Sequence, residues 1–311
     1  MTDISLEIDS LSKSYGALKA VDQLNLRVNR GEIFGLLGPN GAGKTTTIHI
    51  ICGLIAPDSG EIRVDGRRVV PGDFEMLRRV GVCTQQNILY DKLTCLEQLV
   101  FAGEMYKLPV NLARRRAELL LEQLGLLEKK DQLANRLSGG MQRRLNFAMG
   151  LVHDPDLVVL DEPESGLDPQ SRVLVREMIR SLARKKTVLF TTHNMDEADR
   201  LCDRVAIIDH GRLLVVDTPE DLKRTAGEGD VMEIDLPQNL PEALREAIAS
   251  LGVQVTTADH TLILRSRALL DKLPRLWELL QNQGVHFEQA RMRSNTLEDV
   301  FITLTGRRLR E

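Results

Sequence analysis

Short apolar runs alternate with segments of helical periodicity over the first two thirds of the chain. Residues 31–38 form an apolar run that ends in glycines, which predicts a buried strand leading into a loop. The same patterns predict strands at 157–160, 187–191 and 205–209, a hairpin at 61–70, helices at 44–54, 169–183 and 195–202, and a helical stretch over 94–150. Strands that alternate with helices indicate a mainly parallel sheet covered on both faces.

A second pattern follows a glycine-rich linker at 227–230. It predicts strand 231–236, helix 241–250, strands 253–257 and 261–265, helix 272–283, strand 285–291 and a last helix at 296–304. The order βαββαβ is that of a small ferredoxin-like α+β domain. We therefore expect two domains, 1–226 and 230–311, the second serving as an accessory or dimerisation domain.

Composition and charge indicate which kinds of binding partner, such as nucleic acid or a membrane, the chain is suited to. The chain has 311 residues and a net charge of −4, which disfavours nucleic acid as the main partner. The local basic clusters are expected to lie on solvated helix faces; they are 114–116, 143–144, 185–186 and 307–308. No apolar run reaches the roughly 18 residues of a membrane span, and the N-terminus has no hydrophobic signal core. Any membrane-spanning part is thus expected on another chain.

The loop after the first buried strand has the pattern G-x-x-x-x-G-K-[ST]. Its residues are Gly38, Pro39, Asn40, Gly41, Ala42, Gly43, Lys44 and Thr45, and Thr46 follows. Glycines let successive backbone N–H groups point inward as an anion nest, and the following helix adds the positive end of its dipole. Lys44 supplies a point charge for the β- and γ-phosphates, and the Thr45 hydroxyl is a hard oxygen ligand for Mg²⁺.

Two acids, Asp161 and Glu162, follow the apolar run at 157–160. A strand that ends in carboxylates places them at the carboxyl edge of the sheet, where ligands bind in open α/β folds. Asp161 can hold Mg²⁺ through water, and Glu162 is a candidate to orient and deprotonate an attacking water. Together with the phosphate loop, this pair predicts a nucleoside-triphosphate site.

The segment from Leu137 to Arg143 lies between these two elements and resembles the LSGGQ signature of the ATP-binding cassette (ABC) family. The resemblance covers residues of about 4–220, with the elements in the family's order. It implies an α/β P-loop NTPase fold with a mixed sheet core and a helical subdomain at about 87–155. Within the family, the chain is most similar to the nucleotide-binding subunits of drug-resistance and nodulation exporters (ABC-2 type). The run at 296–306 also resembles the end of those subunits.

The resemblance assigns roles to residues at matching positions. Tyr15 matches the aromatic residue that stacks on adenine. Gln85 matches the glutamine that touches Mg²⁺ and water, although Gln86 follows it directly. Glu162 matches the catalytic glutamate and His193 the switch histidine. Glu164 stands where relatives often have Thr or Ser and adds a charge beside the site.

The resemblance also implies a second copy of the site. In the family, the phosphate loop of one subunit and the signature of another enclose one ATP, so we expect a homodimer with Mg²⁺. The signature residues are Ser138, Gly139, Gly140 and Met141, and Asp168 lies in the loop that crosses between partners. The resemblance further implies ATP hydrolysis that drives export through a separate permease, from the cytoplasmic face of the inner membrane. Residues 87–108, with Leu89, Tyr90 and Phe101, are the candidate groove for a permease helix.

Two other functions remain open at this point. A soluble cassette ATPase acting on nucleic acid or ribosomes is disfavoured by the single cassette and the near-neutral charge. The stretch between Lys44 and Ser138 is also too short for the long coiled coil of repair-type members. A scaffold that binds ATP without turnover is disfavoured by the presence of Asp161, Glu162 and His193.

Overall fold

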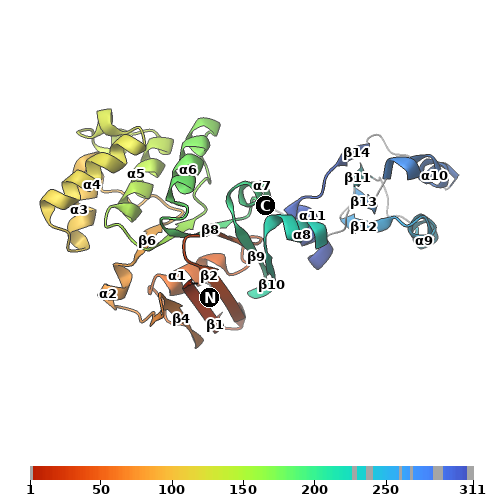
Figure 1. Cartoon of the computed structure of the whole chain (residues 1–311), viewed down its shortest axis with the longest axis horizontal. Helices are drawn as coiled ribbons and strands as arrows, with labels where there is room; N and C mark the ends of the chain where they lie inside the picture. The colour runs from red at the N-terminus through yellow and green to blue at the C-terminus, as the bar shows by residue number, and fades with distance from the viewer. Residues whose placement is uncertain are drawn as a thin grey trace. The chain divides into compact units, whose positions relative to one another are not determined.

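The computed structural model describes residues 3–225, 230–235, 241–258, 261–266, 269–282 and 290–306. The chain forms two compact units, Met1–Val215 and Val216–Glu311 (Figure 1). Helix α8 (Pro219–Thr225) falls in the second unit, whereas the boundary expected from the sequence lies after it. The exact domain limits therefore stay a prediction.

The first unit contains a six-stranded sheet in the order β10-β9-β3-β8-β7-β6. Its strands are β3 (Ile33–Leu37), β6 (Val80–Cys83), β7 (Leu157–Asp161), β8 (Thr187–Thr192), β9 (Arg204–Asp209) and β10 (Arg212–Asp217). Strand β3 pairs in parallel with β8 and β9, and β7 pairs in parallel with β6 and β8. Every residue of β3, β7 and β8 is buried, as expected for a parallel sheet covered on both faces. The carboxyl ends of these strands consequently share one edge.

A second sheet of the first unit has the order β2-β1-β4-β5. Its strands are β1 (Ile4–Tyr15), β2 (Leu18–Asn29), β4 (Ser59–Val64) and β5 (Arg67–Arg68). The hairpin expected at 61–70 is confirmed by the pairing of β4 with β5, which leaves Asp65 and Gly66 as the turn. The long strands β1 and β2 had no counterpart among the expected elements. Register shifts along their pairing, with Ser10 and Gln23 at positive φ, interrupt the period-2 alternation that identifies a strand.

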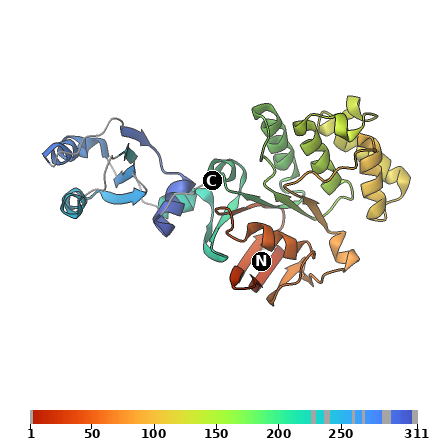
Figure 2. The same cartoon turned by 180° about the vertical axis from the view of Figure 1, so that it is seen from behind.

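The described part of the first unit also contains seven α-helices. They are α1 (Lys44–Ile51), α2 (Phe74–Leu77), α3 (Cys95–Met105), α4 (Val110–Gln123), α5 (Gly139–Leu151), α6 (Pro169–Leu182) and α7 (Met195–Leu201), with 3-10 turns η1 (Leu127–Lys129) and η2 (Ala134–Arg136). In Figures 1 and 2, α3, α4 and α5 lie together apart from the β1–β2 hairpin. The helical stretch expected at 94–150 is thus three helices, the first capped by Thr94 and Glu97 in a capping box. Helix α1 ends earlier than expected, at Ile51, because Gly53 takes a positive φ.

The second unit has a four-stranded sheet in the order β12-β13-β11-β14. Its elements are α8, β11 (Asp230–Asp235), α9 (Glu242–Ser250), β12 (Gln254–Ala258), β13 (Thr261–Ser266), α10 (Leu269–Asn282), β14 (Ala290–Arg293) and α11 (Leu297–Thr305). The predicted βαββαβ order is confirmed, and its strands pair antiparallel as in a ferredoxin-like fold. The expected linker residues 227–229, residue 236 of the first strand, residue 283 of the second helix and residues 285–289 of the last strand lie outside the described residues.

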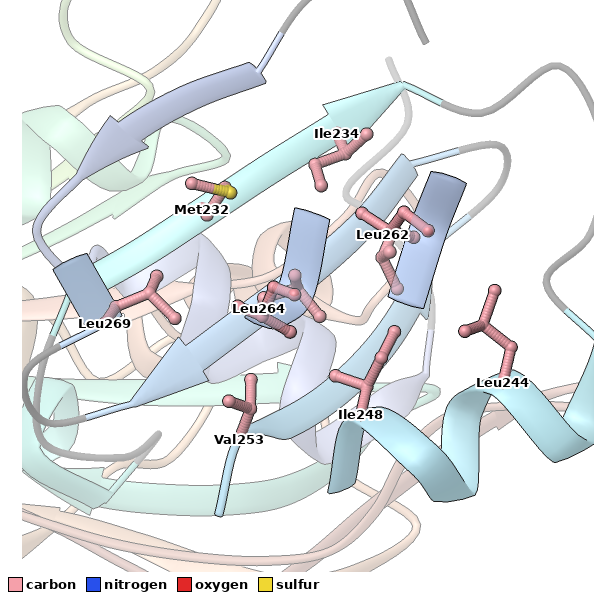
Figure 3. Packing of buried hydrophobic residues seen from close by; sticks show 10 residues of the cluster. Met232, Ile234, Leu244, Ile248, Val253, Leu262, Leu264 and Leu269 are labelled. Carbon is pink, nitrogen blue, oxygen red and sulfur yellow. The ribbon is translucent and has the colours of Figure 1, made fainter. Parts of the chain in front are cut away.

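The core of the second unit is aliphatic. Leu244 and Ile248 on α9 point toward Leu262 and Leu264 on β13 (Figure 3). Strand positions that alternate in sequence therefore share one buried face of the sheet, and α9 and α10 supply the other half of the core. Across the described parts of both units, no helix combines the length and the apolarity needed to cross a bilayer.

Candidate functional site

The predicted phosphate loop joins β3 to α1 at the carboxyl edge of the parallel sheet. Gly43 caps α1 with φ 102°, and a Cβ there would lie 2.2 Å from the carbonyl oxygen of Ala20. At Gly38 a Cβ would lie 2.3 Å from the carbonyl oxygen of Ile208. Only glycine fits these positions. Between them, Asn40 and Gly41 are exposed, Pro39 is half-buried and Ala42 is buried.

The Lys44 side chain forms hydrogen bonds with the beginning of the same loop. Its Nζ donates to the carbonyl oxygens of Gly38 at 2.7 Å and Pro39 at 3.1 Å. The side chain is 6% exposed, and this burial lowers the pKa of Lys44, although the carboxylates of Glu162 and Asp161 act in the opposite direction. The hydrogen bonds of Nζ are thus to neutral carbonyl oxygens of the loop, and the Glu162 carboxylate lies farther away, at 3.9 Å.

The end of β7 brings the two predicted acids to the same place. The Thr45 hydroxyl lies 3.5 Å from Asp161 Oδ2, and the Thr191 hydroxyl donates to Asp161 Oδ1 at 2.6 Å. Thr191 also accepts from the backbone N–H of Glu162 at 3.1 Å. The expectations from the sequence did not include Thr191, whose position at the end of the neighbouring strand β8 is its only signal.

Glu162 is the centre of the cluster. Its backbone is left-handed, with φ 46°, which is strained for a residue with a side chain. Gln85 Nε2 donates to Glu162 Oε2 at 3.2 Å, and His193 Nδ1 lies 3.1 Å from Glu162 Oε1. Lys44 Nζ lies 3.9 Å from the same Oε1. The structure thus brings together four predicted site residues that are far apart in the sequence, and it places Gln85 against the glutamate.

Tyr15 lies elsewhere in the first unit. It ends β1 at the tip of the β1–β2 hairpin, paired with Leu18, and is 51% exposed. Lys13 Nζ lies 5.9 Å from the centre of its ring. An exposed aromatic face is suited to stacking on a flat ligand. Its assignment to adenine stays a prediction.

The signature residues begin α5. The hydroxyl of Ser138 caps the helix by accepting from the N–H of Met141 at 3.4 Å, and Ser138 and Gly139 are exposed. Gly140 approaches α6 so closely that a Cβ would lie 2.3 Å from the Ser171 hydroxyl. The first turn of a helix has N–H groups without intrahelical partners.

Asp168 caps α6 beside this end of α5. Its Oδ1 accepts from the N–H groups of Gln170 and Ser171 at 3.0 Å, and Ser171 Oγ donates to Oδ2 at 2.6 Å. These bonds, that of the Ser171 hydroxyl above all, lower the pKa of Asp168. The signature and the predicted dimer loop are therefore adjacent in one chain.

Two basic residues contradict the expectation from the sequence. Arg143 and Arg144 on α5 were expected on a solvated face, but they are 4% and 8% exposed. Arg143 donates to backbone carbonyls of the two loops that carry Gln85 and Glu162, and Arg144 donates to the Leu124 carbonyl at 2.6 Å. The expectation was wrong because α5 is largely enclosed in the first unit, where backbone carbonyls replace water as acceptors for both guanidinium groups.

Glu164, whose charge had no explanation in the sequence, is paired. It is 2% exposed and receives a fork of hydrogen bonds from Arg176, with Nε at 2.7 Å and 3.0 Å and Nη2 at 2.7 Å. Glu197 lies close by and accepts from the Thr192 hydroxyl at 2.9 Å. Burial and the charge of Glu164 raise the pKa of Glu197 to about 7. Two carboxyl groups thus share one arginine next to the loop of Glu162.

The residues present fit ATP and Mg²⁺. The loop offers backbone N–H groups, a helix N-terminus and the Lys44 charge, the combination that binds polyphosphate. Thr45 and Asp161 offer hard oxygen atoms 3.5 Å apart, which suits one Mg²⁺ that keeps several waters.

Comparisons with known proteins agree with this geometry. The family model described as "ABC transporter" matches residues 21–165. "Nod factor export ATP-binding protein I" of Ralstonia nicotianae is 41% identical over 98% of this chain and 95% of its own length. "Daunorubicin resistance ATP-binding protein DrrA3" of Streptomyces coeruleorubidus is 38% identical over 100% of this chain and 99% of its own. "Linearmycin resistance ATP-binding protein LnrL" of Bacillus subtilis is 37% identical over 98% and 100%.

Solved structures show the same fold. One described as an ATP-binding subunit of an ABC transporter superposes with a TM-score of 0.66 at 32% identity, over 71% of this chain and 92% of that one. A dimeric ATP-binding cassette in a post-hydrolysis state, bound to ADP and Pi, superposes with a TM-score of 0.63 at 26% identity, over 68% and 98%. The expected resemblance and fold class are confirmed. The chain belongs to the ABC transporter family, among the ATP-binding subunits that include these export and drug-resistance proteins.

Proposed function

We propose that this chain binds ATP with Mg²⁺, hydrolyses it to ADP and phosphate, and thereby drives export through a separate membrane permease. The observation that supports this most is the convergence of Lys44, Gln85, Glu162 and His193 at the edge where Thr45 and Asp161 also meet. Charge stabilisation and positioning dominate phosphoryl transfer, and these side chains supply both.

Each residue then has a defined task. The loop N–H groups and Lys44 hold the β- and γ-phosphates, and Thr45, Asp161 and Gln85 hold Mg²⁺ directly or through water. Mg²⁺, when bound, neutralises charge on the phosphate oxygens. Glu162 orients the attacking water and accepts its proton, while Gln85 and His193 fix the two oxygens of its carboxylate. Tyr15 supports the adenine ring.

The chemistry is tested by Glu162→Gln, which keeps the size of the side chain and removes the proton acceptor. We expect turnover, measured as phosphate release, to fall by about 100-fold or more, with ATP affinity unchanged. Glu122→Gln, on the exposed face of α4, is the control and should release phosphate like the wild type. Normal turnover in Glu162→Gln would remove the assigned role. Lys44→Ala should instead weaken ATP binding itself.

We also propose that two copies of the chain enclose ATP. Ser138 and Gly139 present an exposed helix start, and Asp168 lies beside it, so a second copy can complete the phosphate site. The dimer should accumulate when Glu162→Gln is mixed with ATP and Mg²⁺, as measured by light scattering. Ser138→Arg in the same background places a bulky cation at the helix start and should abolish that dimer. A chain that stays monomeric in both would refute this arrangement.

A groove of about 540 Å³ on the first unit is the proposed permease contact. It is lined by Ile88, Tyr90 and Phe101 together with Leu54, Phe74, Leu77, Met105 and Tyr106, while Leu89 is not among its lining residues. Tyr90 and Phe101 meet edge to face at 5.4 Å, and both are partly exposed. Such a groove suits one amphipathic helix of a permease.

The proposed location, peripheral on the cytoplasmic face of the inner membrane, follows from that docking. Phe101→Asp should reduce membrane recovery of the chain in cells that contain the permease, whereas Leu119→Asp on the exposed face of α4 should not. Equal recovery of both variants would place the contact elsewhere.

A further inference from the structure

Arg143 is a buried cation whose acceptors are all backbone carbonyls in the described contacts. Nε donates to the carbonyl oxygen of Pro163 at 3.2 Å. Nη1 donates to those of Thr84 at 2.5 Å and Gln85 at 2.7 Å. Nη2 donates to those of Asp161 at 3.0 Å and Glu162 at 2.8 Å. A guanidinium has five N–H donors in a rigid fork, so each donor has one acceptor here.

These acceptors belong to two separate loops. Thr84 and Gln85 follow β6, while Asp161, Glu162 and Pro163 end β7 and begin the loop after it. Their side chains meet at a single hydrogen bond, from Gln85 to Glu162 at 3.2 Å. The guanidinium therefore fixes the distance between the two backbones that this side-chain contact requires.

The neighbouring contacts show that this end of α5 is built to hold the Gln85 loop. Asn146, one turn after Arg143, donates to the Thr84 carbonyl at 3.4 Å and accepts from the Ile88 N–H at 3.4 Å. Glu162 needs such support more than most residues, because its left-handed backbone is strained and its carbonyl is one of the five acceptors.

We propose that Arg143 is a positioning residue for the hydrolysis assigned under the proposed function: it sets Gln85 against Glu162 by holding both loops through their carbonyls. It touches no reacting atom. Its loss lets the two loops separate by a fraction of an ångström or more, which misplaces the carboxylate that orients water. Nucleotide binding by the Lys44 loop does not depend on it.

The test compares Arg143→Met with Arg144→Met in the full chain, with ATP, Mg²⁺ and phosphate release as the readout. Arg144 is the matched control, since it is the next residue, is also buried, and donates to the carbonyl of Leu124 rather than to either of the two loops. We expect kcat of Arg143→Met to fall by about 100-fold with KM and ATP affinity within about threefold. Arg143→Lys, which reaches fewer carbonyls, should recover part of the rate, and Arg144→Met should stay within about threefold.

A second measurement separates positioning from a merely structural role. In a Gln85→Ala background the Arg143→Lys substitution should cost clearly less than in the wild type, because the contact that it supports is already missing. The proposal would be overturned if Arg143→Lys lowered kcat equally in both backgrounds, or if Arg144→Met lowered kcat as much as Arg143→Met. A fall in kcat/KM of Arg143→Met that came from a raised KM would also overturn it. An inactive wild type would instead refute the proposed function, and the two failures are distinguishable.

Discussion

Arg143 in the first unit and Arg265 in the second are both buried, yet they are held in different ways. Arg143 donates to neutral carbonyls. Arg265, 2% exposed, donates to the carboxylate of Asp299 at 2.9 Å and to Asn295 and Thr303. A carboxylate cancels the charge of its partner, whereas carbonyl dipoles only solvate it. The first arrangement therefore keeps a guanidinium charge between the loops of Gln85 and Glu162, and the second is a neutral connection between α11 and its sheet.

A third buried cluster, around Arg176 in the first unit, differs from the network around Asp299 in the balance of its charges. In that network, the acids Asp299 and Glu233 meet the arginines Arg265 and Arg293, so two negative charges balance two positive ones. Around Arg176, the two acids Glu164 and Glu197 meet one arginine, and burial together with the charge of Glu164 raises the pKa of Glu197 to about 7. Buried charges must balance or change protonation. Among the described contacts, the cluster around Arg176 in the first unit is unbalanced, whereas the network around Asp299 in the second unit is balanced.

The largest expected effect comes from breaking the balanced cluster. Asp299→Asn leaves Arg265 and Arg293 without their shared carboxylate and should destabilise the second unit by about 3–5 kcal/mol. Urea unfolding of the full chain measures this, and ATP affinity should not change. Glu298→Gln on the same helix should cost under about 0.5 kcal/mol. A cost for Asp299→Asn as small as that would mean that the network is not a structural connection.

The unbalanced cluster should respond to pH. The pKa of Glu197 rises from 4.5 to about 7 in the folded chain, first through burial and then through Glu164. The folded state therefore binds this proton more tightly than the unfolded state, so the contribution is fully present below pH 4.5 and is lost as the pH rises through 7. The loss amounts to at most about 3 kcal/mol. Comparing urea midpoints at pH 5 and pH 8 should show a larger fall for the wild type than for Glu197→Gln; equal falls would exclude Glu197 as the cause.

The smallest effect belongs to exposed charges. Asp154 pairs with Lys186 at 2.6 Å and Arg116 at 3.0 Å but is half exposed. Asp154→Asn keeps its left-handed backbone, which Asn also tolerates, and should cost about 1 kcal/mol or less. Arg114→Gln, which breaks only the pair with Glu118, should cost less than about 0.5 kcal/mol. Thermal unfolding compares the two variants. A loss of stability larger than that of Asp299→Asn would show that these exposed pairs contribute more than the buried network around Asp299.

The sequence predicted the parts of the fold that have regular periodicity. The buried strands β3, β7 and β8 and the βαββαβ order of the second unit followed from short apolar runs and turns. Strands β1 and β2 did not, because bulges obscure their alternation, and β6 did not, because it is a four-residue strand that contains a glycine.

The residues of the candidate site likewise fall into those that a local sequence pattern reveals and those that it does not. Residues in a fixed local pattern, such as Lys44, Thr45 and Asp161, could be named from spacing. The role of Arg143 could not, since a run of two arginines on a helix gives no sign of being enclosed by two distant loops. The partners of Glu164 were equally hidden, because Arg176 and Glu197 come from different helices.

The backbone of Glu162 determines which replacements at that position are informative. With φ at 46°, a β-branched residue there would add conformational strain to the loss of the carboxylate, so its effect on turnover would mix two causes. Glycine would relieve the strain but would also release the loop. Glutamine alone preserves side-chain length and backbone preference, so it isolates the removal of one ionisable oxygen.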